Sequence, residues 1–150
     1  MSTPTPSDER LDELLRMFNE RATLAHTFGL RLRFDERYRP VVELPYNPAL
    51  NHSMGGVHGG VYMTLLDIAA WFAAATAHEV GVWVATSELT THLLKPVFRQ
   101  DLRAVGQLIQ SGRRLDIAEA HLYDAEGRLV GHGVGTFAVL PHLRADTSIF

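Results

Sequence analysis

The sequence contains no cysteine among its 150 residues. This absence excludes disulfide bonds, zinc sites with thiolate ligands and a thiol nucleophile, so any nucleophile must be an oxygen or nitrogen group or water. An excess of basic residues is missing too, because 14 Lys and Arg stand against 17 Asp and Glu and give a formal net charge of −3. Such a chain has no general attraction for phosphate backbones or anionic lipid. We therefore expect neither a nucleic acid nor a membrane as partner.

The sequence also shows no sign of secretion or of a membrane span. Residues 1–20 are polar and lack the basic and apolar regions of a signal peptide. The longest apolar run, residues 59–77, has Asp67 near its centre, which favours a buried helix over a membrane-spanning one. We expect a cytoplasmic protein.

The composition predicts a single globular domain. Hydrophobic residues make up 46% of the chain and charged residues 21%, which is enough apolar material for a real core. Pro4 and Pro6, placed among Ser and Thr, predict a disordered lead-in over residues 1–7. The domain then occupies residues 8–150.

The hydrophobic spacing predicts an α+β fold. Ser7 is a suitable N-cap, and leucines at helical spacing after it predict a short amphipathic helix that runs to about His26. A run of about five turns from Gly59 or Gly60, ended by Gly81, predicts a long helix that is apolar on nearly every face. Strand patterns occupy residues 30–35, 41–44, 82–94, 102–109, 114–123 and 128–140, and a hairpin turn at residues 124–127 joins the last two.

The glycine-rich segment before the long helix is the first candidate for chemistry. It reads Gly-Gly-Val-His-Gly-Gly over residues 55–60. The first amides of a helix have no partner inside the helix and lie at the positive end of its dipole. The amides of Gly59 and Gly60 can therefore donate to an anion or to a developing oxyanion. The alternative is a flexible loop without chemical function.

Asp67 is the second candidate, because it lies two turns into an otherwise apolar helix. Burial of a carboxylate is costly and raises its pKa toward the range of a general base. The alternative is an acid that faces solvent or caps a loop. Gly59 and Asp67 are eight residues apart, about 12 Å along one helix, so one chain cannot bring both to a single carbonyl. Two antiparallel copies of the helix can, and an apolar helix also needs cover beyond its own sheet, so we expect a homo-oligomer.

These residues resemble a known family. The resemblance rests on Asn51, on Gly-Val-His-Gly-Gly-Val over residues 56–61, on Thr-Leu-Leu-Asp over 64–67, on Thr-Ser-Glu-Leu over 86–89 and on Leu-Lys-Pro over 94–96. The sequence is similar to the hotdog-fold acyl-CoA thioesterases, in particular to the subgroup associated with phenylacetate degradation. The resemblance implies a curved antiparallel sheet wrapped around the long central helix, and dimers that pair into tetramers.

The resemblance also implies catalytic roles. Asp67 corresponds to the nucleophile or general base, the Gly59 amide to the group that polarises the thioester carbonyl, and His58 to the residue that shapes the turn. Two further roles each have two candidates in this chain. Asn51 or His52 would orient the water or the carbonyl, and a hydroxyl that orients the attacking water would come from Thr86 or Ser87.

Other residues are candidates for binding the substrate. Met63 and Trp71 lie one turn to either side of Asp67 and would line an acyl pocket, with ordinary core packing as the alternative. Basic side chains that could meet the phosphates of coenzyme A, or simply be solvated, are Lys95, Arg103, Arg113 and Arg114. Coenzyme A would then be part of the substrate and not a bound cofactor.

No metal site is expected. His52 and His58 have no third ligand at a recognisable spacing. Four further histidines follow no motif and are interpreted as hydrogen-bonded or exposed residues: His78, His92, His121 and His132.

The leading hypothesis is hydrolysis of a small aryl or short- to medium-chain acyl-CoA to the free acid and coenzyme A. One alternative is a sensor that binds acyl-CoA without turnover. Another is a hotdog-fold hydratase or dehydratase, which would need a catalytic histidine paired with the acid. Replacement of Asp67 by Asn separates enzyme from sensor, because it should abolish turnover and leave binding nearly unchanged.

Overall fold

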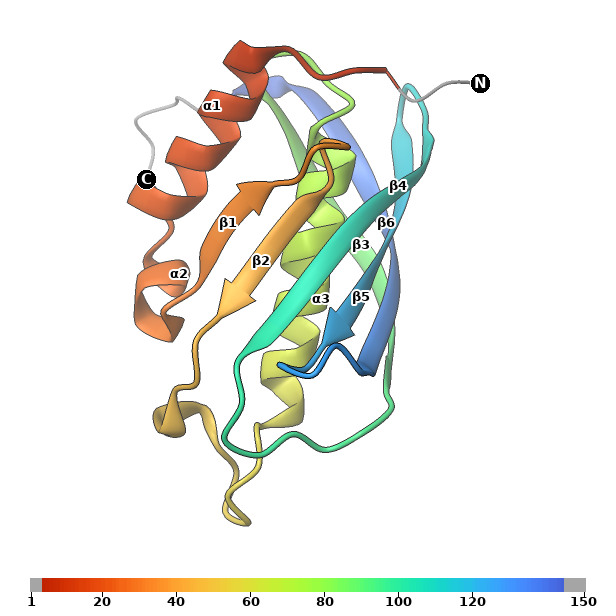
Figure 1. Cartoon of the computed structure of the whole chain (residues 1–150). Helices are drawn as coiled ribbons and strands as arrows, with labels where there is room; N and C mark the ends of the chain where they lie inside the picture. Colours follow the sequence, from red (N-terminus) through yellow and green to blue (C-terminus); the bar gives the residue numbers. More distant parts are fainter. Residues whose placement is uncertain (1–3, 145–150) are drawn as a thin grey trace.

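The computed structural model describes residues 4–144 of the chain, with side chains up to residue 141. Six strands form one antiparallel sheet in the order β1-β2-β4-β5-β6-β3. The sheet curves around the long helix α3, and α1 lies beside β1 (Figure 1). The strand bounds are Arg31–Phe34 (β1), Pro40–Leu44 (β2), Val82–Leu93 (β3), Leu102–Ser111 (β4), Leu115–Tyr123 (β5) and Leu129–Arg144 (β6). The predicted architecture, a curved antiparallel sheet around one long helix, is confirmed.

Helix α3, Gly59–Ala75, is the centre of the core. His58 is the N-cap of α3. The alanine-rich sequence of the helix favours helix formation, and its small side chains let the sheet approach closely. The closest approach is at Gly106 of β4, where a Cβ atom would lie 2.0 Å from the carbonyl oxygen of Ala69. Only glycine fits there. The helix ends at Ala75 and not at Gly81 as predicted.

Gly81 has a different role from the one expected. Its φ of +82° places it in the left-handed region, in the turn that leads from the end of α3 into β3. The segment between Thr76 and Gly81 forms turns.

The N-terminal segment corrects another prediction. Helix α1, Asp8–Arg16, is capped by Ser7 as expected, but a π-helical turn over Met17–Arg21 follows, and the chain is extended at Ala22 before α2, Thr23–Phe28. The single helix to His26 is therefore wrong.

Tertiary contacts explain the break between α1 and α2. The π-helical turn places the ring of Phe18 edge-on against Phe72 of α3, with centroids 5.3 Å apart. Asn19 accepts from the backbone N–H of Leu32 at 2.9 Å and donates to its carbonyl oxygen at 3.0 Å, which ties the turn to β1. These contacts outweigh the propensity of the segment for a regular helix.

The remaining elements agree more closely with the predictions from the sequence. The predicted strands are confirmed with small shifts at their ends. The predicted hairpin is confirmed too, because Gly127 has a φ of +79° and Asp124 accepts backbone N–H groups across the turn. Of the predicted lead-in, residues 1–3 lie outside the described part, and residues 4–7 form neither helix nor strand. No helix within residues 4–144 is both long enough and apolar enough to cross a membrane.

Candidate active site

The N-terminus of α3 presents one free amide. The Nδ1 atom of His58 accepts from the N–H of Gly60 at 2.9 Å, which satisfies that donor and fixes the first turn of the helix. Within residues 4–144, no acceptor contacts the N–H of Gly59. Of the two amides that the sequence suggests as donors, Gly59 is therefore the one that is open to a ligand.

A folded loop precedes this helix start. Asn51 and Val57 form an isolated antiparallel bridge, and the Val57 N–H donates to the carbonyl oxygen of Val97 at 3.0 Å. Asn51 donates through Nδ2 to the Tyr46 hydroxyl at 3.2 Å, whereas its Oδ1 atom is buried and has no hydrogen-bond partner in the described structure. A buried polar atom without a partner is uncommon and costly, so this oxygen is a candidate contact for a ligand or a water.

His52, the other candidate for the role of Asn51, has a structural contact. Its Nδ1 atom accepts from the backbone N–H of Met54 at 3.0 Å, and its backbone bonds with Gly55 and Gly56 close the turn. This arrangement favours Asn51 as the residue that faces the site.

The candidate site has a second half, which is formed by Asp67 in the middle of α3. The Oδ1 atom of Asp67 accepts from the Thr86 hydroxyl of β3 at 2.9 Å. Burial raises the pKa of the Asp67 carboxyl above its usual range, and the hydrogen bond from Thr86 opposes this rise by favouring the charged form. A half-buried carboxylate with a raised pKa has the properties of a general base.

A β-bulge selects Thr86 over Ser87. Thr86 pairs with Phe137 of β6, but the next paired residue of β3 is Glu88, which pairs with Thr136. Ser87 is therefore the extra residue of the bulge, and it is exposed. The bulge leaves Thr86 as the hydroxyl that contacts Asp67.

The two halves of the site are separated within one chain. Gly59 and Asp67 lie eight residues apart on the same helix, about 12 Å along its axis. Strand β3, which carries Thr86, is the last strand of the sheet, so among the described residues one of its edges has no neighbouring strand.

The two apolar residues near Asp67 have different surroundings. Met63 is 44% exposed. Trp71 donates through Nε1 to the carbonyl oxygen of Val84 at 2.8 Å, and its ring packs edge-on against Trp83 and Phe72. Met63 is thus open to a ligand, whereas Trp71 packs within the fold.

The basic residues do not form one cluster in the single chain. Lys95 is exposed in the loop after β3, near the start of α3, where the Tyr62 hydroxyl donates to its carbonyl oxygen at 2.8 Å. Arg113 and Arg114 are exposed in the β4–β5 hairpin, which lies at the opposite end of the sheet (Figure 1). Arg103 lies over a tyrosine ring on β5.

Comparison with known proteins assigns the family. The model of the thioesterase superfamily matches residues 54–131, which include the start of α3, Asp67 and Thr86. The chain belongs to the thioesterase superfamily. This membership places it among the thioester hydrolases, and it confirms the resemblance drawn from the sequence.

Individual relatives agree with the thioesterase assignment. A candidate esterase of Saccharolobus solfataricus is 30% identical over 105 residues, which are 70% of this chain and 74% of that protein. A second candidate esterase of the same organism is 25% identical over 146 residues, 97% of this chain and 94% of that protein.

Solved structures of the superfamily share the fold. A thioesterase family protein from Silicibacter pomeroyi superposes with a TM-score of 0.81 at 25% identity, over 88% of this chain and 98% of that chain. The PaaI protein of the E. coli phenylacetic acid degradation operon superposes with a TM-score of 0.77 over 88% of this chain and 94% of that chain. At 19% identity, this second likeness concerns the fold alone.

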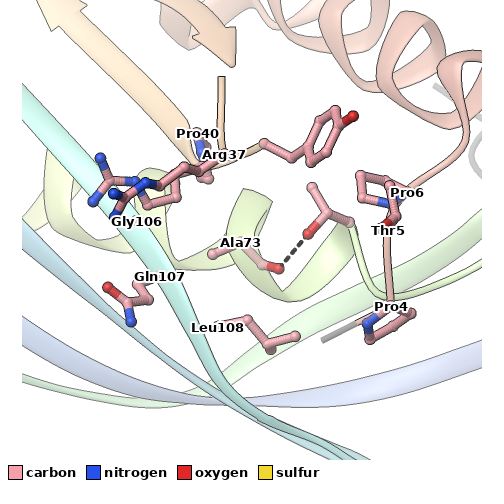
Figure 2. A pocket seen from close by; sticks show the side chains of 12 residues that line it. Pro4, Thr5, Pro6, Arg37, Pro40, Ala73, Gly106, Gln107 and Leu108 are labelled. Atoms are coloured by element: carbon pink, nitrogen blue, oxygen red, sulfur yellow. Dashed lines mark hydrogen bonds between the residues drawn. The ribbon is translucent and has the colours of Figure 1, made fainter. Parts of the chain in front are cut away.

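This thioesterase-family chain also has a cavity of about 380 Å³, which lies away from the candidate active-site residues. Figure 2 shows that the lead-in, the β1–β2 turn, β4 and the C-terminal part of α3 surround it. None of the predicted site residues lines it, and the hydroxyl of Thr76 there is bonded to the carbonyl oxygen of Ala73 at 2.7 Å. This cavity is therefore separate from the Asp67 and Gly59 positions.

Tyr46 is not among the predicted site residues, but its hydroxyl accepts the hydrogen bond from Asn51. Tyr46 lies in an irregular loop, where no periodicity predicts a neighbour. A tyrosine next to prolines and asparagines in a loop carries no chemical signature of its own, so no signal in the sequence could have found it.

Proposed function

We propose that this chain is an acyl-CoA thioesterase that hydrolyses a small aryl or short- to medium-chain acyl-CoA. The observation that carries the proposal is the half-buried Asp67 carboxylate, held by Thr86, in a member of the thioesterase superfamily. The free amide of Gly59 supports it, because thioester hydrolysis needs a donor for the oxyanion.

The active unit in this proposal is a dimer. Two copies paired across the open edge of β3 by a two-fold axis bring their α3 helices antiparallel, so that Gly59 of one copy faces Asp67 of the other. The separation of about 12 Å within one chain is the reason a second copy is needed. Such dimers would pair further into a tetramer, as the family resemblance implies.

The proposed chemistry uses the carboxylate of Asp67, a water molecule and the N–H of Gly59. The carboxylate of Asp67 removes a proton from water, and the oxygen of that water attacks the thioester carbonyl carbon. The carbonyl oxygen becomes an oxyanion and accepts from the N–H of Gly59. The C–S bond then breaks, the thiolate of coenzyme A takes the proton, and the free acid forms. In the covalent variant, the carboxylate attacks the carbon itself and water cleaves the resulting anhydride.

Substrate recognition follows from the same arrangement. The unpartnered Oδ1 atom of Asn51 would hold the attacking water, and the exposed Met63 would contact the acyl group. In an antiparallel dimer, Arg113 and Arg114 of one copy approach the end where Lys95 of the other copy lies. This pairing would bring together the cations that the single chain keeps apart, near the phosphates of coenzyme A.

The first test measures release of the coenzyme A thiol from phenylacetyl-, hydroxybenzoyl-, hexanoyl- and palmitoyl-CoA. The wild type, Asp67→Asn and the control Asp12→Asn are compared, since Asp12 is an exposed acid on α1. We expect Asp67→Asn to lower turnover by about 100- to 10,000-fold and Asp12→Asn to have no effect. Binding of the esters without turnover by the wild type would instead favour the sensor.

A second test addresses the composite site. Asp67→Asn and Gly59→Pro each remove one half, so each homodimer should be inactive. In a refolded equimolar mixture, half of the dimers are mixed and each mixed dimer holds one intact site, which restores about one quarter of wild-type activity. If both groups acted within one chain, mixing would restore nothing.

A further inference from the structure

The face of the sheet that points away from α3 carries a row of histidines. Residues 118, 120 and 122 of β5 are fully buried under the helix, so the residues that alternate with them lie on the opposite face. On that face, His121 of β5 is paired directly with His132 of β6, and His132 is paired with His92 of β3. Three histidines therefore occupy neighbouring positions on three adjacent strands.

A glutamate completes the cluster. Glu119 lies two residues before His121 on the same face of β5, and its Oε2 atom is 3.0 Å from the Nε2 atom of His132. The rings of His121 and His132 have centroids 4.7 Å apart. One nitrogen of each of these two histidines and one oxygen of Glu119 all lie within 4.8 Å of one another, and all three residues are partly buried.

The strand register places these groups together. Tyr123 pairs with Leu129 next to the hairpin turn, but a register shift follows, and Leu122 pairs with Gly131. The shift sets His121 opposite His132. Without it, the residue opposite His121 would be Gly131, and the two imidazoles would lie on opposite faces of the sheet.

We propose that His121, His132 and Glu119 bind a divalent transition metal ion of the zinc type. Two imidazoles and one carboxylate are a known ligand set for Zn²⁺, with a water at the fourth position. Ligand atoms about 2.0–2.1 Å from a tetrahedral ion lie roughly 3.3 Å apart. The 3.0 Å between Glu119 Oε2 and His132 Nε2 is close to this value. The three ligand atoms all lie within 4.8 Å of one another, so a bound metal would draw the wider pairs together.

This site is separate from the proposed active site. Asp67 lies on α3, which packs against the other face of the sheet. The metal would therefore stabilise the pairing of β5 with β6 and would take no part in the hydrolysis. The proposal does not depend on the proposed function, and it differs from the expectation from the sequence that the chain has no metal site.

The test measures metal binding by the untagged 150-residue chain after treatment with a chelator. Co²⁺ reports coordination by histidine through its visible absorption, and competition with a chromogenic chelator gives the dissociation constant for Zn²⁺. The variants are His121→Gln and His132→Gln, with His26→Gln as a control because His26 is an exposed histidine on α2, outside the cluster.

We expect the wild type and His26→Gln to bind one ion with the same affinity, and each cluster variant to bind at least about 100-fold more weakly. The Co²⁺ absorption should disappear in both cluster variants. Circular dichroism spectra without metal should be the same for all four proteins, because none of the substituted side chains belongs to the hydrophobic core. Absence of binding by the wild type, or equal binding by the His121→Gln and His132→Gln variants, would overturn the proposal.

Discussion

The two ends of helix α3 differ in how their polar groups are satisfied. At the C-terminal end, the buried guanidinium of Arg10 donates to the carbonyl oxygens of Ala75 and Val82 at 2.9–3.1 Å. The carboxylate of Glu13 bonds with Arg10 and accepts from the N–H of Gly81. Side chains of the same chain thus form hydrogen bonds with the backbone polar groups at the end of the helix and in the turn after it.

The N-terminal end of α3, by contrast, has polar groups without hydrogen-bond partners among the described residues. The Gly59 amide has no acceptor within residues 4–144, the buried Oδ1 atom of Asn51 has no partner, and Met63 is exposed. Unsatisfied polar groups cost stability, so they persist where a ligand or a second copy supplies the missing contacts. The C-terminal end of the helix thus contributes to stability, and the N-terminal end is where the proposed function would place a ligand.

The largest effect is expected at the C-terminal end. Arg10→Met removes the donors of two buried carbonyl groups and the partner of Glu13, and should lower the free energy of unfolding by about 3–5 kcal/mol. Urea unfolding measures this loss, with Arg16→Met as the exposed control. Turnover per folded molecule should be unchanged, and a large loss of activity without loss of stability would contradict the division between the two ends.

Gly59→Pro tests the N-terminal end, and its expected effect on activity is slightly smaller in free energy than the loss of stability expected for Arg10→Met. Proline is well tolerated at the first position of a helix, so the substitution removes the amide donor with little strain. We expect kcat to fall by about 100- to 1,000-fold, which is typical of losing one oxyanion donor. The control is Gly59→Ala, which keeps the N–H but brings the same Cβ atom 3.0 Å from Leu93. An equal loss in both variants would assign the effect to crowding.

Thr86→Val should have the smallest effect, and it should depend on pH. The hydroxyl favours the charged form of Asp67, so its removal raises the pKa of that carboxyl further. A general base acts when deprotonated, so the acid limb of the pH–rate profile should move to higher pH. Activity on that limb should fall roughly tenfold, as expected for one hydrogen bond to a charged group.

Measurement of the pH–rate profile also separates two roles for the Thr86 hydroxyl. Thr86→Ser keeps the hydroxyl and should retain the wild-type profile. A loss of equal size at every pH would instead show that Thr86 holds the attacking water.

The positions of Gly59 and Asp67 on α3 could be predicted because they depend on local structure. A His-Gly-Gly segment before an alanine-rich run starts a helix with a free amide, and Asp67 then follows at a fixed distance along the same helix. By contrast, the prediction of one helix to His26 failed, because contacts of Phe18 and Asn19 with distant residues break the N-terminal segment.

The sequence by itself determined the fold class, the long helix and the distance between Gly59 and Asp67, because periodicity and helix geometry act over a few neighbouring residues. Only the tertiary structure decided that Thr86 contacts Asp67 and that His121 lies opposite His132. Both depend on shifts of strand register. A single extra residue in a strand changes which side chains meet, and packing between segments far apart in the chain determines where it lies.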